Sequence, residues 1–518
     1  MISTDDQQFK DNLAIEEITY AIPAQSFNIA CSITTDETLP VVTEFALRIT
    51  YVCGSISPDQ LQKFFGFSEK ETSAVIKSLL SERLIQWNDD KLELTPYAEE
   101  RFQESSDELP RFFKIKDWSA EVVFDLISFS PTGEPQRVKR TRSMIELIQQ
   151  DPEKQSKTIQ WAERSFQKNF RKIFKNDRAD IYKISELSAG EFFSIPLPCV
   201  FHLNFDGQTS VQRNIDDASF GDRQEIAEAI SDSMAGEDKL NNDYFENFIA
   251  TFEDDVLKQY VSSKTFDLKK YVQDVHLNKV VGYSNSKISP ILGSLHLKRN
   301  SSILLDWLQT WNSCDPLPDH DLNEGLSAIW LAPKSQLWSR SRTVRGVVQK
   351  LNQVMAYSTD EIIADDSSAE TVDDVDTGVR VILQIGTSDH NSAGNIYREN
   401  FKNLWATNQT LMGGSLEMFF VPGRFVCALF HFSLEHQAVS VPLGFISSHT
   451  THLEAASKLI SKGIFEKGNI NGLNNGKENN TQDSTRDFSF FLNHASAVKK
   501  ADSLQVKSSN TLTLRKKE

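Results

Sequence analysis

The sequence is poor in cysteine. It contains five cysteines in 518 residues, and no two of them have C-x-x-C spacing. This scatter argues against both a disulfide framework and a zinc site, so each cysteine is expected to be a small buried apolar residue. The five are Cys31, Cys53, Cys199, Cys314 and Cys427.

Signals for membrane insertion and export are also missing. No run approaches the roughly eighteen apolar residues that a membrane-spanning helix needs. The segment from Met1 to Asp6 has neither the basic end nor the apolar stretch of a signal peptide. We therefore expect a cytoplasmic protein without membrane contact.

The chain has no overall surplus of positive charge. It holds 55 Lys and Arg against 72 Asp and Glu, a formal net charge of −17. That balance argues against a protein that coats nucleic acid with its whole surface. The charge is uneven, however, because residues 137–178 carry twelve basic and five acidic side chains. This basic segment is a candidate for contact with phosphates.

The length predicts about three domains. We expect a leader with some strand content at 1–39, a helical domain at 40–104, a mixed α/β region at 111–315 and an α/β sandwich at 326–465. Residues 468–518 are rich in Asn, Ser, Lys and Thr and are expected to be mostly disordered. The predicted fold class is therefore multidomain α/β.

Residues 40–104 show the clearest order of elements. A helical pattern ends at Gly54, a second begins with Ser57 as N-cap, and Ser68 with Glu71 forms a capping box for a third. Residues 84–95 then alternate between apolar and polar around a polar turn, which predicts a hairpin. Three helices followed by a hairpin resemble a winged helix-turn-helix domain, a resemblance that implies association with nucleic acid.

The third helix of this domain has no net charge. Lys70, Lys77 and Arg83 are offset by three glutamates. DNA-reading helices gain much of their affinity from phosphate contacts, which need surplus basic residues. Two interpretations stay open: these three residues contact duplex DNA, or the domain docks on a partner protein.

The basic segment holds two groups of cations. The first is Arg137, Lys139, Arg140 and Arg142, four cations in six residues. In the second, Phe166, Phe170 and Phe174 recur at helical spacing and predict an apolar face. The basic residues around that face are Arg164, Lys168, Arg171, Lys172 and Lys175. The segment either contacts DNA phosphates or is a core-facing helix with a solvated basic side.

Residues 326–465 alternate between strand and helix patterns. A buried strand is expected at 326–333, 379–385 and 416–422, with helices at 343–357 and 395–407 between them. A hairpin at 424–447 and a helix at 451–462 complete the order. This alternation predicts an α/β sandwich with a mainly parallel sheet.

That order resembles one repeat of the phospholipase D superfamily, whose hairpin carries His-x-Lys and then Gly-Ser-x-Asn. The resemblance implies a histidine nucleophile with Lys and Asn stabilising the phosphoryl oxygens. Here the matching hairpin has His431, but Ser433 stands in place of the lysine and residues 444–447 lack the asparagine. We therefore expect this copy to be unable to stabilise a phosphoryl transition state.

Other candidate catalytic or metal-binding groups are weaker. A literal His-x-Lys occurs at His296 and Lys298, where an exposed polar pair on a strand is the expected structure. His431, His436, His449 and His452 lie near one another in sequence, but no carboxylate or cysteine pair accompanies them, so no metal site is expected. Because the chain has no phosphate-binding Gly-rich loop and no G-x-S-x-G motif, no cofactor is expected either.

These observations predict a non-catalytic, DNA-associated accessory protein that binds duplex DNA, positions partner proteins, or both. Such combinations are typical of components of prokaryotic phage-defence or DNA-transaction complexes, an association and not a derivation. One alternative is a phospholipase D-like phosphodiesterase or nuclease using His296 and Lys298, or His431. Another is a protein-interaction scaffold with a docking winged helix.

Overall fold

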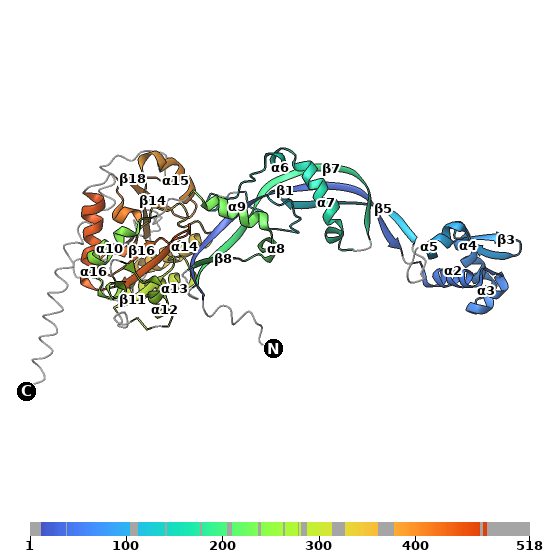
Figure 1. Cartoon of the computed structure of the whole chain (residues 1–518), viewed down its shortest axis with the longest axis horizontal. Coiled ribbons are helices and arrows are strands. Elements are labelled where there is room, and N and C mark those ends of the chain that lie inside the picture. Colours follow the sequence, from blue (N-terminus) through green and yellow to red (C-terminus); the bar gives the residue numbers. More distant parts are fainter. Residues whose placement is uncertain are drawn as a thin grey trace, which may run out of the picture. The chain divides into compact units, whose positions relative to one another are not determined.

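The structure, a computed structural model (Figure 1), divides into two compact units. The first comprises Met1–Pro23, Gln136–Gln150 and Ser194–Glu518, and the second Ala24–Pro135 and Asp151–Phe193. Among the described residues, no helix is long and apolar enough to cross a membrane. The residues described are 12–37, 39–103, 112–139, 142–176, 179–204, 210–236, 240–262, 265–277, 279–280, 287–312, 327–360, 378–466 and 470–473.

Residues 40–103 form a small helical domain within the second unit, called here the three-helix domain. Its helices and strands follow the predicted order, with a short first strand and a closing helix in addition. The elements are α2 (Val41–Cys53), β2 (Ser55–Ile56), α3 (Pro58–Phe65), α4 (Glu69–Ser81), β3 (Ile85–Asn88), β4 (Lys91–Leu94) and α5 (Pro96–Gln103). The strands pair in the order β2-β4-β3.

The predicted helix caps of this domain are confirmed. The Ser57 hydroxyl accepts the Gln60 N–H, and Ser68 and Glu71 form the expected capping box. Gly54 follows α2 with a φ of 71°, a backbone conformation that favours glycine. Contrary to expectation, Cys53, the last residue of α2, is exposed. Three of the other cysteines, Cys31, Cys199 and Cys427, are buried.

The strand content expected in the leader is present as one long strand, β1 (Asn12–Glu37). It is longer than expected because the period-2 pattern continues through the second half: Phe27, Ile29, Cys31 and Ile33 are buried in alternation. β1 pairs antiparallel with β5 (Phe112–Asp125). The sheet has the order β5-β1-β7-β8, with β7 at Asp180–Asn204 and β8 at Ser210–Ile215, and β6 (Ile145–Glu146) pairs with β1.

Helix α7 (Thr158–Phe174) packs on this sheet in the second unit, preceded by the short α6 (Pro152–Ser156). Phe166 and Phe170 are buried against residues of β1 and β5. The Trp118 ring stacks on Phe166 at a centroid distance of 5.9 Å. Fully burying a phenylalanine side chain contributes about 1.5–3 kcal/mol, so the apolar face of α7 belongs to the core.

The first unit contains an eight-stranded mixed sheet. Its order is β11-β17-β16-β15-β12-β13-β14-β18, in which only β12–β13 and β13–β14 are parallel among the described strands. The prediction of a mainly parallel sheet was therefore wrong. Short turns join β15 to β16 and β16 to β17, so these strands run antiparallel without helical crossovers. The strands are β11 (Ile288–Leu292), β12 (Ser327–Leu331), β13 (Gly378–Gln384), β14 (Asn403–Thr407), β15 (Leu416–Val421), β16 (Phe425–Phe432), β17 (Val441–Ser447) and β18 (Ile470–Gly472).

Two boundaries of this domain differ from those predicted. Residues 395–407 were expected to form one helix, but α15 (His390–Tyr397) ends early and 403–407 form β14, whose Leu404 and Ala406 are fully buried. The sheet also extends beyond 326–465, because β11 and β18 are its edge strands. Most of the expected tail and Cys314 lie outside the described residues.

Helices cover both faces of the sheet. α13 (Lys298–Asn312) and α14 (Thr343–Asp360) share a core with Trp330 and Phe419. On the other face, α10 (Phe245–Phe252) places Phe245 and Phe248 against Phe430. The remaining α-helices are α8 (Ala218–Gly221), α9 (Gln224–Met234), α11 (Asp255–Lys258), α12 (Leu268–His276) and α16 (Thr450–Lys458). A π-helix at Leu459–Phe465 continues α16. Strands β9 (Val261–Ser262) and β10 (Thr265–Phe266) form a separate hairpin.

Candidate nucleic-acid interface

Helix α4 presents an exposed stripe without carboxylates. Lys70, Ser73, Ala74, Lys77 and Ser81 occur at i, i+3, i+4, i+7 and i+11, and all five are exposed. This spacing places them on one side of the helix. The buried residues of α4 lie on the opposite side and are Thr72, Ile76 and Leu79. We call the exposed five residues the α4 stripe.

The acidic residues of this helix lie beside the stripe. At 3.6 residues per turn, Glu69 and Glu71 are each rotated about 100° from Lys70. Glu71 also serves the cap, since the Ser68 N–H donates to its carboxylate at 2.8 Å. That bond and one from the Ser68 hydroxyl lower the pKa of Glu71. The helix is neutral overall, but its outward side carries only positive charge.

The hairpin after α4 is unsuited to phosphate contact. Asp89 and Asp90 form its exposed tip between β3 and β4. Trp87 is 50% exposed on β3. Arg83, the third predicted DNA-contacting residue, is exposed just after α4. The two carboxylates at the hairpin tip would repel a phosphate backbone. We therefore look for a DNA contact of this domain on α4 and not on the hairpin.

The first group of cations in the basic segment belongs to the first unit. Arg137 and Lys139 are exposed on either side of Val138, whose N–H donates to the Ser194 carbonyl at 2.9 Å. Alternate residues of an extended chain point the same way, so these two cations share a side. Arg142 is exposed as well, and Arg140 lies outside the described residues.

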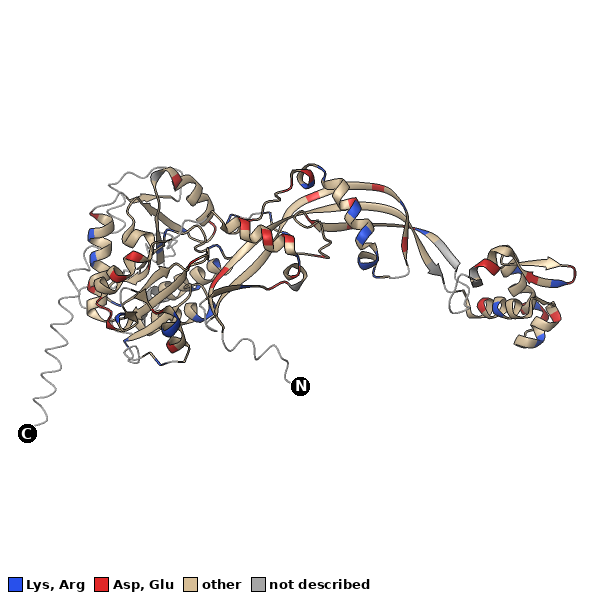
Figure 2. Cartoon of the chain, viewed as in Figure 1, with Lys and Arg blue, Asp and Glu red and all other residues tan. Residues whose placement is uncertain are grey.

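The second group lies on α7, in the second unit. Arg164, Lys168, Arg171, Lys172 and Lys175 are all exposed, and their helical spacing places them opposite the buried phenylalanines. Figure 2 colours the Lys and Arg positions along α7 blue. The Arg171 guanidinium is paired with Asp180 at 2.8 Å, and Arg164 lies over the Trp161 ring. We call these five residues the α7 stripe. The structure therefore separates the basic segment into two groups that belong to different units.

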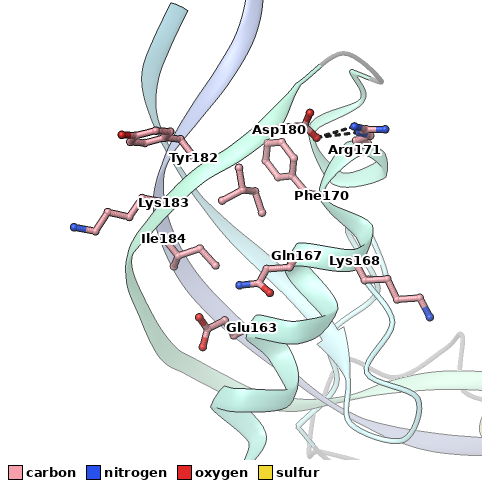
Figure 3. A pocket seen from close by; sticks show the side chains of 10 residues that line it. Glu163, Gln167, Lys168, Phe170, Arg171, Asp180, Tyr182, Lys183 and Ile184 are labelled. Atoms are coloured by element: carbon pink, nitrogen blue, oxygen red, sulfur yellow. Dashed lines mark hydrogen bonds and ion pairs between the residues drawn. The ribbon is translucent and has the colours of Figure 1, made fainter. Parts of the chain in front are cut away.

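A groove of about 720 Å³ runs between α7 and β7 (Figure 3). Glu163 and Gln167 point into it, while Lys168 points away. Phe170 and Ile184 contribute apolar lining. Lys168, Arg171 and Lys183 also line the groove, together with a second carboxylate, Asp180. Lys168 points away from the groove and Arg171 is paired with Asp180, so the outward side of α7 is the better candidate for anion contact.

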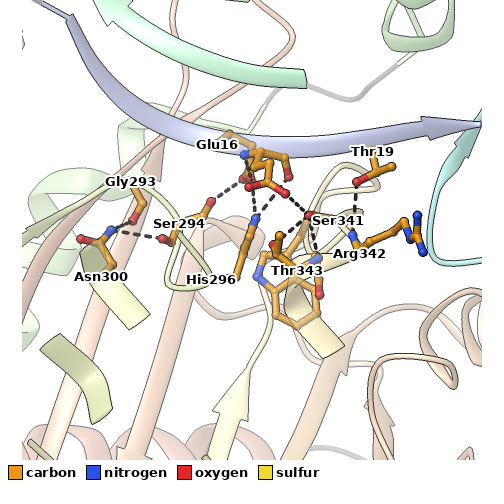
Figure 4. Close-up of polar contacts among 12 residues, drawn as sticks. Glu16, Thr19, Gly293, Ser294, His296, Asn300, Ser341, Arg342 and Thr343 are labelled. Atoms are coloured by element: carbon orange, nitrogen blue, oxygen red, sulfur yellow. Dashed lines mark hydrogen bonds and ion pairs between the residues drawn. The ribbon is translucent and has the colours of Figure 1, made fainter. Parts of the chain in front are cut away.

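His296 and Lys298 do not form a reactive pair. His296 lies in the turn between β11 and α13, not on a strand as expected, and is 4% exposed, whereas Lys298 is exposed at the start of α13. The His296 Nε2 is 3.2 Å from a Glu16 carboxylate oxygen (Figure 4). Burial alone would lower the pKa of His296, but Glu16 and Glu17 outweigh it and raise that pKa.

The same network joins β1 to the sandwich. The Ser294 hydroxyl donates to Glu16, and the Ser341 hydroxyl donates to Glu17. The Arg342 N–H donates to the Thr19 hydroxyl at 3.2 Å. All of these groups belong to the first unit. The arrangement holds β1 in place through side-chain hydrogen bonds.

His431 is enclosed beside a buried carboxylate. It is 2% exposed, its Nε2 is 2.7 Å from Glu417, and its Nδ1 is 3.0 Å from the Ser440 hydroxyl. The indole N–H groups of Trp330 and Trp338 donate to the other Glu417 oxygen at 2.9 and 3.0 Å. Burial raises the pKa of Glu417, but these hydrogen bonds and the His431 charge lower it overall.

The position that the resemblance assigns to a lysine beside His431 holds a serine. Ser433, at the predicted lysine position, donates its hydroxyl hydrogen bond to the Leu240 carbonyl. His452 is buried against Phe252 and Phe445, and burial lowers its pKa to about 4. Among the described residues, no group of three or more His, Cys, Asp or Glu is placed to hold a metal ion.

Sequence reasoning missed several partners. Glu16 and Glu417 are 280 and 14 positions from the histidines they contact, and nothing in the local pattern couples them. Ser73, Ala74 and Ser81 of the α4 stripe were also missed. For those three the signal was present, because they follow Lys70 at helical spacing.

Comparison with known proteins adds little. No protein-family model and no curated protein sequence matches the chain. A solved structure that does match is that of TrmBL2, an archaeal chromatin protein described as showing a novel mode of DNA binding. The match covers 83% of this chain and 94% of that chain at 9% identity, with a TM-score of 0.19. A TM-score this low does not indicate a shared fold, and nothing about this chain follows from it.

Proposed function

We propose that the chain is a non-catalytic DNA-associated accessory protein whose residues 40–104 act as a winged helix-turn-helix domain. In this proposal α4 enters the major groove of duplex DNA. The observation that carries it is the α4 stripe, in which two lysines, two serines and an alanine lie together without a carboxylate. Lysine and serine side chains are common contacts to phosphates and base edges.

The α7 stripe is proposed as a further phosphate contact. Lys168, Lys172 and Lys175 make no ion pair among the described residues. They recur every three or four residues along one side of α7, a spacing of roughly 5–6 Å. Arg137, Lys139, Arg140 and Arg142 are proposed as additional contacts on the same electrostatic grounds.

The test is DNA binding by the full chain across a salt series. Lys70→Ala combined with Lys77→Ala should weaken binding to a fluorescent duplex and reduce the steepness of the log Kd against log salt plot by about 1.8, because each lost phosphate contact removes about 0.9. Both side chains are exposed, so the domain should stay folded. Anisotropy titration and circular dichroism measure the two quantities.

The matched control replaces two exposed lysines of the first unit, Lys258→Ala with Lys350→Ala. It removes the same charge from the chain and should leave the salt dependence unchanged. Equal effects of the two double variants would show that net charge, not the α4 stripe, controls binding. If the α4 variant keeps DNA binding but loses association with a protein partner, the docking interpretation replaces this one.

A further inference from the structure

Helix α2 exposes an apolar stripe on the side away from its own core. Val41, Phe45, Ile49 and Val52 occur at i, i+4, i+8 and i+11, so they line one side of the helix. Val41 is 69% exposed, Phe45 45% and Val52 82%. The core-facing side of α2 is formed by Thr43, Ala46, Leu47 and Thr50. Ile49 is partly buried and also packs against the core of the three-helix domain, so the exposed apolar surface comes mainly from the other three residues. We call Val41, Phe45, Ile49 and Val52 the α2 stripe.

The α2 stripe is bordered by one acid and one base. The Arg48 guanidinium lies over the Phe45 ring at 5.3 Å, and its Nη1 is 3.6 Å from a Glu44 carboxylate oxygen. At 1.5 Å per residue the stripe is roughly 16 Å long. Single exposed apolar residues are ordinary, but a contiguous row with a charged rim marks a contact surface.

This pattern is complementary to itself under two-fold rotation. In an antiparallel pair with its axis at the middle of the stripe, Val41 of one helix lies opposite Val52 of the other. Phe45 then lies opposite the segment 48–49 of the second copy. The rotation keeps each flank on its own side, so Glu44 of each copy meets Arg48 of the other.

We propose that α2 is a dimerisation helix through which two copies of this chain associate, apolar stripe against apolar stripe and Glu44 against Arg48 across the two-fold axis. A second copy is favoured over an unrelated partner by charge complementarity. Each helix presents both members of the ion pair at the spacing that the two-fold requires, and closed two-fold dimers use one patch twice. The proposal does not depend on DNA binding.

The first test is sedimentation of the full chain over a range of concentrations. The wild type should change from the mass of one chain to that of two as concentration rises. Phe45→Glu should raise the dissociation constant more than about ten-fold, because a central aromatic anchor is replaced by a charge. Phe64→Glu is the matched control, since Phe64 is 61% exposed on α3 of the same domain. It should leave the mass distribution unchanged.

The second test uses complementary charge variants. Glu44→Arg alone and Arg48→Glu alone should each be monomeric at concentrations where the wild type is a dimer, because like charges face each other across the axis. Mixing these two variants should restore a dimer, because opposite charges then meet. Neither chain regains an ion pair within its own helix, so only contact between two α2 helices explains rescue.

The proposal is overturned if the wild type stays monomeric at every concentration, if Phe45→Glu dimerises as well as Phe64→Glu, or if mixing fails to restore association of variants that are each monomeric. In those cases another part of this chain or a different protein covers the stripe. Circular dichroism of each variant establishes that it is folded, which is expected because every altered side chain is at least partly exposed.

Discussion

His296 shows what one buried side chain contributes at the residue scale. Its imidazole lies against Glu16 and Glu17 of β1, and these carboxylates raise its pKa above the ordinary 6.5 despite burial. A raised pKa in the folded state stabilises the protein fully below pH 6.5, and this stabilisation is lost as pH rises through the folded value. The network in Figure 4 should therefore weaken toward alkaline pH.

We predict that His296→Gln lowers the free energy of unfolding by about 3–5 kcal/mol near pH 6, because it leaves a buried carboxylate without its cation. The difference from wild type should shrink as pH rises. Urea unfolding followed by circular dichroism at several pH values measures it. His436→Asn is the control, since His436 is exposed with a φ of 60°, which asparagine tolerates. A difference that grows with pH would contradict the assigned ion pair.

At the scale of one element, helix α7 has a buried side that packs on the sheet and an exposed side that carries cations. Its phenylalanines pack on the sheet and its cations point outward. These features fit the second interpretation of the sequence, a core-facing helix with a solvated basic side, and phosphate contact by that side stays a prediction. The core contact makes α7 a rigid support for the cations, because the side chains that hold it are separate from those available for phosphates.

Charge reversal on α7 should affect DNA binding without affecting the fold of the helix. Lys168→Glu with Lys172→Glu should weaken duplex binding and flatten its salt dependence by at least about 1.8, with no loss of helix, since Phe166 and Phe170 are untouched. The same reversal at Arg137, Lys139, Arg140 and Arg142 tests the other cation group. Anisotropy across a salt series is the measurement, with Lys258→Glu and Lys350→Glu as control. Unchanged affinity at all salt concentrations would remove the reversed group from the contact surface.

At the scale of the whole molecule, the chain combines the α4 and α7 stripes with two histidines, His296 and His431, that each contact a buried glutamate. We predict that the purified full chain cleaves neither plasmid DNA nor a nitrophenyl phosphodiester, with or without divalent metal ions. His431 is bound to Glu417 in the core and has Ser433 in place of a lysine. Loss of one preorganised charge-stabilising donor costs about 10²–10³ in rate, and several are missing. Robust cleavage abolished by His296→Ala or His431→Ala would overturn this prediction.

Local patterns in the sequence determined much of the fold. The caps at Ser57 and Ser68, the glycine after α2 and the hairpin of β16 and β17 depend on neighbours a few residues away, and each formed as predicted. The amphipathic period of α7 likewise predicted its buried face. For the α4 stripe the sequence held all the information needed, because helical spacing alone separates Lys70 and Lys77 from the glutamates.

Only the tertiary structure determined the features that depend on residues far apart in the sequence, such as strand direction and the partners of the buried histidines. The sheet is mostly antiparallel because hairpins, not crossovers, join its central strands, and a buried strand has the same composition in either direction. The carboxylate partners of His296 and His431 come from other strands, Glu16 from β1 and Glu417 from β15. The local sequence around each histidine therefore did not predict its burial or its ion pair. The division of the basic segment between two units also follows from the path of the chain, because sequence proximity does not determine which core a residue joins.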